Sequence, residues 1–223
     1  MSEIIEVRRR LHETNDQCAA ELRKMFAEAG TLVVELVSSP GSGKTTLLEM
    51  TVEYFNGQLR IAALLGDIAT EEDVLRLQEV GASAFQIVTG GACHFDAHLV
   101  GAGISSPGFE MPDILFLENV SNLVCPASYD LGADFKTVLL SAPEGEDKPL
   151  KYPAIFSRAA VCLLTKMDLL SHLPFSPEMA IEHIARLNPD ALILPISAMD
   201  GDGFEEWCSL LERELESKRS ESS

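Results

Sequence analysis

One short run of residues constrains the fold more than any other part of the chain. Residues 39–46 read SPGSGKTT and stand between an apolar stretch at 32–37 and a helical pattern at 45–55. Glycines let the backbone turn tightly, so that successive N–H groups point at one anion, and the following helix adds the positive end of its dipole. The run therefore predicts a phosphate-binding loop between a strand and a helix.

The side chains of this loop have distinct expected roles. Lys44 is expected to reach the β- and γ-phosphates of a nucleotide, and the hydroxyl of Thr45 is expected to bind Mg²⁺. The general motif begins with glycine six residues before the lysine, whereas this chain has Ser38 there. The nucleotide-binding residues predicted in this loop are Gly41, Ser42, Gly43, Lys44, Thr45 and Thr46.

The apolar pattern predicts an α/β fold. Helical patterns separate most of the β-type stretches, so we expect a mostly parallel, twisted sheet with helices on both faces. The stretches lie at 32–37, 59–65, 84–88, 114–117, 135–140, 160–164 and 191–196, and the helical patterns include 45–55, 71–79, 177–187 and 203–215. We expect one P-loop domain over residues 1–216, of which 1–30 form a helical extension, and a disordered tail at 217–223.

Composition narrows the classes of partner. The formal net charge of −18 disfavours nucleic-acid binding, which needs a basic face. No apolar run approaches the roughly 18 residues of a membrane span. The five cysteines are odd in number and lack the spacing of a disulfide framework, which favours the cytoplasm.

Two acidic residues follow predicted strands. Asp67 ends the stretch at 61–66, and Glu118 ends the stretch at 114–117. Ligands of parallel sheets lie beyond the carboxyl ends of the strands, so both carboxylates should face the phosphate loop. One would hold Mg²⁺ and the other would orient the attacking water, and the sequence leaves the two roles open.

A second motif indicates which base is bound. Thr165-Lys166-Met167-Asp168 resembles the Asn-Lys-x-Asp motif of GTPases, in which the aspartate accepts hydrogen bonds from guanine. The stem of Lys166 would cover the base, and Ser197 and Ala198 would form a loop behind it. Because Thr165 replaces the asparagine, we expect one bracing amide to be missing and GTP specificity to be looser.

Taken together, these segments resemble the HypB family of GTPases, within the SIMIBI class of P-loop proteins. The resemblance runs from about residue 15 to 211. It is carried by SSPGSGKT at 38–45, GDIAT at 66–70 with Asp73, TG at 89–90 followed by CHFDAH at 93–98, ENVSNLVCP at 118–126 and EGEDKPLKYP at 144–153. The chain departs from the family at Ser121, Pro143 and Thr165, where glycine, threonine and asparagine are usual. The CxxCGC and His-rich stretches of some members do not occur in this sequence.

Thiolate and imidazole groups form a second candidate site. Cys93 and His94 lie in a glycine-bounded stretch, Cys125 follows Glu118 by seven residues, and His98 is within reach by sequence. Such ligands suit Ni²⁺, Zn²⁺ or copper. The resemblance implies Ni²⁺, or Zn²⁺, at the interface of a homodimer that forms with GTP. The segment from Glu118 to Cys125 would link nucleotide state to metal geometry.

The resemblance also implies the remaining expectations. Lys148 and Lys151 could reach the partner's nucleotide or could be a solvated pair, and both interpretations stay open. The implied function is GTP-dependent nickel insertion into [NiFe]-hydrogenase, with hydrogenase maturation proteins and the hydrogenase large subunit as partners. The alternatives are a GTPase chaperone for another nickel enzyme such as urease, a P-loop kinase for a small molecule, and a non-catalytic dimeric switch with structural zinc.

Overall fold

The strands form one sheet that orders the whole chain. The computed structural model describes residues 2–66, 71–89, 91 and 94–221. Seven strands lie in the order β3-β2-β4-β1-β5-β6-β7, and every pairing among them is parallel. The strands are β1 (Leu32–Ser38), β2 (Ile61–Leu65), β3 (Ser83–Gln86), β4 (Ile114–Glu118), β5 (Phe135–Ser141), β6 (Val161–Thr165) and β7 (Leu192–Pro195). This confirms the predicted fold class, with strand ends shifted by at most two residues.

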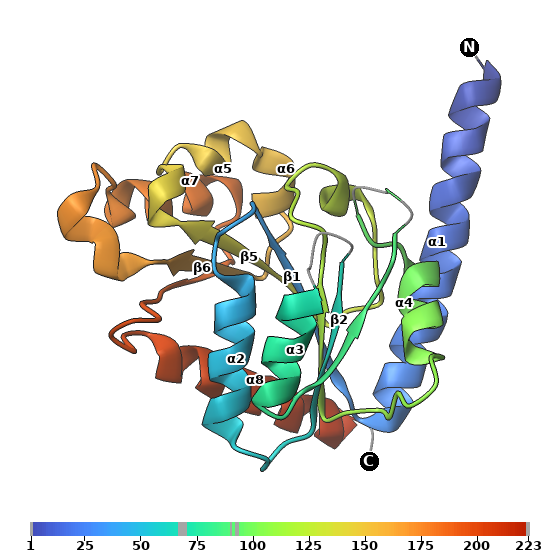
Figure 1. Cartoon of the computed structure of the whole chain (residues 1–223). Helices are drawn as coiled ribbons and strands as arrows, with labels where there is room; N and C mark the ends of the chain where they lie inside the picture. The colour runs from blue at the N-terminus through green and yellow to red at the C-terminus, as the bar shows by residue number, and fades with distance from the viewer. Residues whose placement is uncertain (1, 67–70, 90, 92–93, 222–223) are drawn as a thin grey trace.

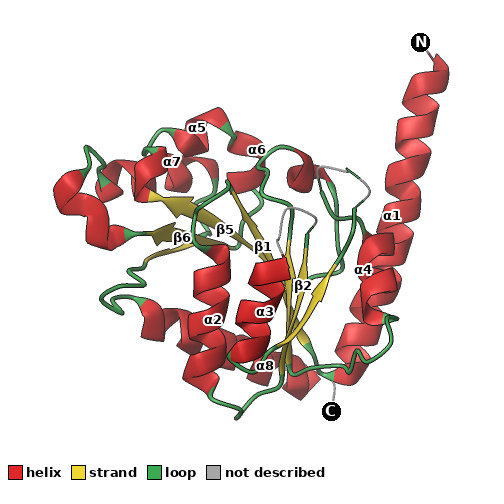
Figure 2. Cartoon of the chain, viewed as in Figure 1, coloured by secondary structure: helices red, strands yellow, loops and turns green. Residues whose placement is uncertain are grey.

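Helices cover both faces of this sheet, as Figures 1 and 2 show. One face packs against α2 (Lys44–Phe55), α3 (Glu71–Glu79) and α8 (Phe204–Glu221). On the other face, α1 (Ser2–Ala29) and α4 (Ala97–Ile104) cover one half, while α6 (Pro153–Phe156) and α7 (Pro177–Leu187) cover the other. The short α5 (Lys148–Lys151) lies beside α7. The described residues also form three 3-10 helices: η1 (Cys125–Ser128), η2 (Ala142–Glu144) and η3 (Met167–His172).

The central strand, β1, explains why the strand segments of this sequence are continuously apolar. All seven residues of β1 are buried, because β4 and β5 flank the strand and helices cover both of its faces. Val34 and Leu36 pack toward α2 and α8. Val33 packs toward α1 and Val37 toward α7. The two-residue period of the strand thus divides one apolar run between the cores on its two faces.

Two features differ from the sequence prediction. No helix was predicted between the third and fourth strands, yet α4 lies there, and its Asp96 cap accepts a hydrogen bond from the Leu99 N–H at 2.8 Å. The prediction of disorder from residue 217 is wrong for the described part, because α8 continues to Glu221. Its last turns are fixed by ion pairs of Lys218 with Asp134 and Arg219 with Asp113. The sequence of a polar tail does not reveal such partners, because they lie far away along the chain.

The N-terminal extension is a single helix. α1 spans Ser2–Ala29 and packs along α4, and Figure 1 shows the two side by side. Its buried residues Ala19, Leu22 and Phe26 contact the sheet at helical spacing. Among the residues described, no helix is both long and apolar enough to span a membrane.

Candidate functional site

The phosphate loop joins the end of β1 to the start of α2. Gly41 and Gly43 have φ angles of +74° and +94°, a backbone region that residues with a Cβ adopt rarely. Gly43 caps α2, and its carbonyl accepts the Leu47 N–H at 2.9 Å. The loop therefore has the backbone shape that the glycines predict. It lines a cavity of about 390 Å³ together with Lys44, Thr45 and Thr46.

Lys44 is held inside this cavity by oxygen atoms from three segments. Its ammonium donates to Ser38 Oγ at 2.8 Å and to Ser121 Oγ at 2.9 Å, and lies 3.9 Å from Glu118 Oε1. Burial lowers the pKa of Lys44, while Glu118 and Glu144 oppose this effect. Ser38, which departs from the general motif, is thus a direct partner of the lysine.

Glu118 is the carboxylate that the structure places at this cavity. It is 7% exposed, and its Oε2 has no hydrogen-bond partner among the described residues. Burial raises its pKa to about 7 although Lys44 acts in the opposite direction. An unpartnered buried carboxylate oxygen in the cavity that Thr45 also lines fits a divalent cation. Asp67 lies outside the described residues, so the division of roles between the two acids stays a prediction.

Two further residues of the cavity come from α3 and were not among the predicted site residues. Asp73 and Arg76 line it, and Arg76 forms a two-point ion pair with Glu49 of α2 at 2.5 and 2.8 Å. Asp73 lies 3.6 Å from Arg76 on the same helix. Asp73 belongs to the family resemblance together with GDIAT at 66–70, but it was not assigned to the site. For Arg76 the available signal was its spacing of three residues from Asp73, which puts both side chains on one side of the helix.

A second cavity, of about 280 Å³, adjoins the first, with Ser42, Gly43, Thr46 and Lys166 lining both. Its other lining residues are Leu47, Met50, Thr165, Asp168, Leu169, Ile196, Ala198 and Met199. The two cavities are thus continuous, which is the arrangement needed for one nucleotide to place its phosphates at the loop and its base at the Lys166–Asp168 turn.

Hydrogen bonds outside the second cavity hold the residues that line it. The buried Ser197 hydroxyl lies 3.3 Å from Asp168 Oδ1 and 3.1 Å from Asp200 Oδ2. Thr165 Oγ1 donates to the Ser42 carbonyl at 2.8 Å. The bracing amide of the asparagine is absent, as expected, but the Thr165 hydroxyl ties the Lys166–Asp168 turn to the phosphate loop, and the effect on GTP specificity stays a prediction.

Glu144 connects the phosphate loop to Lys148. Its Oε2 accepts hydrogen bonds from Ser42 Oγ at 2.9 Å and from Ser141, and Lys148 Nζ lies 3.1 Å from its Oε1. Burial acts to raise the pKa of Glu144, but these hydrogen bonds lower it overall. Lys151 is more exposed and pairs with Asp147 at 2.7 Å. Within a single copy of the chain, Lys148 and Lys151 thus each pair with the acidic residue four positions earlier.

The candidate metal ligands fall on two adjoining segments. His94 stacks on Tyr129 with ring centroids 3.9 Å apart, and Tyr129 directly follows η1, which begins at Cys125. His98 is exposed on α4. Burial lowers the pKa of His94, which favours the neutral imidazole that binds metals, although Asp96 opposes the shift. Cys93 lies outside the described residues, and the described residues contain no cluster of three or more potential ligands.

These features define a nucleotide-binding protein of the P-loop class. Residues 32–195 match the family described as CobW/HypB/UreG, nucleotide-binding domain. The hydrogenase maturation factor HypB of Azotobacter chroococcum mcd 1 is 44% identical over 96% of this chain and 70% of its own length. The first curated relatives are covered over 66 to 72% of their lengths.

Two solved structures agree with this match. The hydrogenase maturation factor HypB of Archaeoglobus fulgidus has a TM-score of 0.86 and 35% identity, covering 91% of this chain and 99% of that one. HypB of Helicobacter pylori in complex with nickel has a TM-score of 0.84 and 39% identity, covering 94% and 97%. The chain belongs to the HypB proteins of the CobW/HypB/UreG family.

Proposed function

We propose that this protein hydrolyses GTP and uses its nucleotide state to control the binding and release of Ni²⁺ during hydrogenase maturation. The relatives from Azotobacter chroococcum and Archaeoglobus fulgidus are described as hydrogenase maturation factors, and HypB of Helicobacter pylori is described in complex with nickel. The observation that carries the proposal is the contact of Lys44 with Ser121, 2.9 Å from Nζ to Oγ. Ser121 precedes Cys125 by four residues, so the phosphate-binding lysine contacts the segment that leads to a candidate metal ligand.

For the nucleotide, each group has a chemical task. The ammonium of Lys44 stabilises negative charge on the β- and γ-phosphates, and the loop N–H groups of residues 41–46 bind phosphate oxygens. Thr45 and Glu118 would hold Mg²⁺, which supplies further neutralisation of the phosphates. Asp168 accepts hydrogen bonds from the guanine N1–H and 2-amino groups.

For the metal, the proposal rests on a change of partners at Lys44. A γ-phosphate competes with Ser121 and Glu118 for the lysine, because a doubly charged oxyanion is the stronger partner. The segment from 119 to 125 then takes a different position, and Cys125 moves with it. Ni²⁺, or Zn²⁺ in its place, is bound as cargo by Cys125, His94 and Cys93, with His98 as a further candidate.

The oligomeric state and partners follow from the same proposal. One copy offers few ligands, so a homodimer that forms with GTP would bring two sets together. Lys148 and Lys151 would exchange their present acidic partners for the nucleotide of the second copy. The maturation proteins and the hydrogenase large subunit receive the metal, and the cytoplasm is the expected location.

The nucleotide part of the proposal is tested by hydrolysis of GTP, XTP and ATP. Lys44→Ala should lower kcat for GTP by about 10²- to 10³-fold, because one positive group at the transferred phosphoryl is lost. Asp168→Asn should shift preference toward XTP, since an amide donates where the carboxylate accepts. Lys24→Ala is the matched control, because Lys24 is an exposed lysine of α1 that pairs with Glu28.

Equal hydrolysis of ATP and GTP by the wild type would contradict the guanine assignment. Normal turnover by folded Lys44→Ala would contradict the phosphate-loop assignment. Transfer of phosphate to an added small molecule, rather than to water, would favour the kinase alternative.

A further inference from the structure

A buried carboxylate lies in the middle of the central strand, away from the nucleotide cavities. Glu35 of β1 is 2% exposed and shares its sheet face with Val33 and Val37. An ionised carboxylate in such a place is costly unless it is paired and hydrogen-bonded. Burial raises the pKa of Glu35, and Lys136 and Asn119 act against that shift. The partners of Glu35 thus decide whether its charge is tolerated.

The first partner leads to the segment that carries His94. Asn119 donates from Nδ2 to Glu35 Oε1 at 2.8 Å, and its Oδ1 accepts the Phe95 N–H at 3.0 Å. Asn119 is 2% exposed and directly follows Glu118. The side-chain amide of Asn119, at the end of β4, therefore links Glu35 to Phe95, the residue that follows His94.

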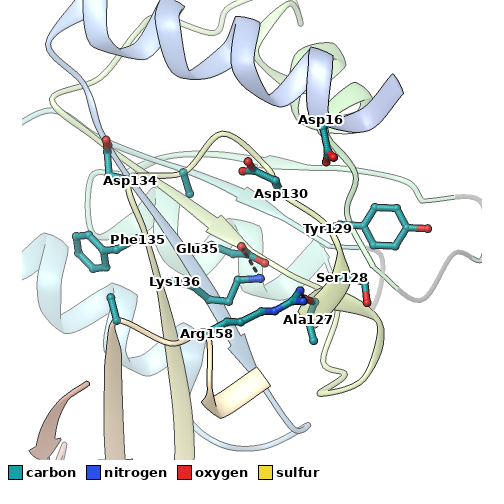
Figure 3. Close-up of a pocket in the computed structure, with 12 residues that line it drawn as sticks. Asp16, Glu35, Ala127, Ser128, Tyr129, Asp130, Asp134, Phe135, Lys136 and Arg158 are labelled. Carbon is teal, nitrogen blue, oxygen red and sulfur yellow. Dashed lines mark hydrogen bonds and ion pairs between the residues drawn. The ribbon is translucent and has the colours of Figure 1, made fainter. Parts of the chain in front are cut away.

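The second partner leads to the segment that carries Cys125. Lys136 of β5 lies 3.1 Å from Glu35 Oε2, and the same ammonium donates to the Pro126 carbonyl at 2.6 Å. Pro126 directly follows Cys125. In Figure 3 the side chains of Glu35 and Lys136 point toward each other, and Ala127 and Ser128 lie nearby.

The segment 127–130, which lies beside Glu35 and Lys136, borders a cavity on one side. The cavity has a volume of about 450 Å³ and is lined by Glu35, Lys136, Arg158 and the segment 127–130, among others. Arg158 donates to the Ala127 carbonyl. Ala127 packs into the core beside α6 and α7, and on the cavity side Lys136 and Arg158 hold the segment by binding the carbonyl oxygens of Pro126 and Ala127.

We infer that Glu35 is a positioning residue that holds the Cys125 and His94 segments in register with Glu118 through Lys136 and Asn119. The inference rests on the proposed function and deepens it, because it names the internal link between the nucleotide site and the metal ligands. A network of this kind is interdependent, so loss of its central charge weakens both arms. Neither Glu35 nor Lys136 lines the nucleotide cavities.

The test compares Glu35→Gln and the double variant Glu35→Gln/Lys136→Met with the wild type. The double variant removes both buried charges, so it avoids an unpaired ammonium that could prevent folding. Asp113→Asn is the matched control: Asp113 is a carboxylate paired with Arg60 and Arg219 before the start of β4. Amide hydrogen exchange at Phe95 and in residues 124–129 is measured without metal, and Ni²⁺ affinity is measured with a GTP analogue and with GDP.

We expect faster exchange at Phe95 and in residues 124–129 of both Glu35 variants, and not in Asp113→Asn. We also expect the Ni²⁺ affinity to fall by about tenfold, the scale on which outer partners affect metal sites, and the ratio of the two affinities to move toward one, with GTP affinity unchanged. Lower stability with unchanged exchange and an unchanged ratio would show a purely structural role and overturn the inference. Wild type that binds no Ni²⁺ would instead overturn the proposed function, while the exchange data still decide whether Glu35 positions the two segments.

Discussion

At the scale of single residues, the positions that depart from common motifs have specific partners in the structure. Ser38, in place of glycine, accepts a hydrogen bond from Lys44 at 2.8 Å and donates to the Ser39 carbonyl. Thr165, in place of asparagine, donates to the Ser42 carbonyl. Both substitutions bring a hydroxyl to the phosphate loop, so departure from a motif need not mean loss of its structural role.

Thr165→Val tests this at the Lys166–Asp168 turn, which is proposed to bind the base. Valine has nearly the same shape but cannot donate, so we expect the free energy of unfolding to fall by about 1 kcal/mol. GTP affinity should weaken, because the turn is no longer tied to the phosphate loop, while the preference for GTP over ATP should persist through Asp168. Chemical unfolding and binding titrations with both nucleotides measure these effects. Loss of the preference with unchanged stability would show that Thr165 acts on the base rather than on the turn.

At the scale of elements, α1 fixes the two segments that carry the candidate metal ligands. Asn15 is 3% exposed and bridges them, because its Nδ2 donates to the Asp130 carbonyl and its Oδ1 accepts the Ala97 N–H, each at 2.9 Å. Arg23 of the same helix binds the Asp130 carboxylate at 2.7 Å. The N-terminal helix is therefore part of the support of the site.

Asn15→Ala should lower the free energy of unfolding by about 1–3 kcal/mol, because the buried Ala97 N–H loses its partner. Amide exchange at Ala97 should become faster as the start of α4 loosens. Asn188→Ala is the comparison, since Asn188 makes a similar bond to the Ala159 carbonyl at 2.8 Å, in a different part of the fold. Equal exchange at Ala97 in both variants would show that Asn15 does not hold α4.

The strands could be predicted from the sequence, whereas the long-range hydrogen bonds between elements could not. Apolar periodicity located all seven strands, because a buried parallel strand is apolar on both faces. The parallel pattern placed Lys44, Glu118 and Asp168 at one edge, because each follows or ends a strand at its carboxyl end. The bonds of Glu35, Asn15 and the tail of α8 were not predictable, since each partner lies far away in sequence and no local pattern marks it.

At the scale of the whole molecule, two sites share the carboxyl edge of one sheet. The nucleotide cavities lie over β1 and β6. His94 lies beside the half covered by α1 and α4, whereas the Cys125 segment packs toward the half covered by α6 and α7 and reaches His94 through Tyr129. Between them runs the segment after β4, which contacts Lys44 through Ser121. A ligand can shift this segment only if it binds one of its positions better than the other, and the resulting coupling must be reciprocal.

The most direct test is a Ni²⁺ titration of wild type and Cys125→Ala, each with a GTP analogue and Mg²⁺ and with GDP. We predict that the nucleotide changes the Ni²⁺ affinity of the wild type by a factor in the range of about 5 to 150, the usual range of allosteric coupling. Cys125→Ala should lose most Ni²⁺ binding and keep its GTP affinity, whereas Cys18→Ala, on α1, should behave like the wild type. Equal Ni²⁺ affinity in all four samples would contradict the coupling of metal to nucleotide.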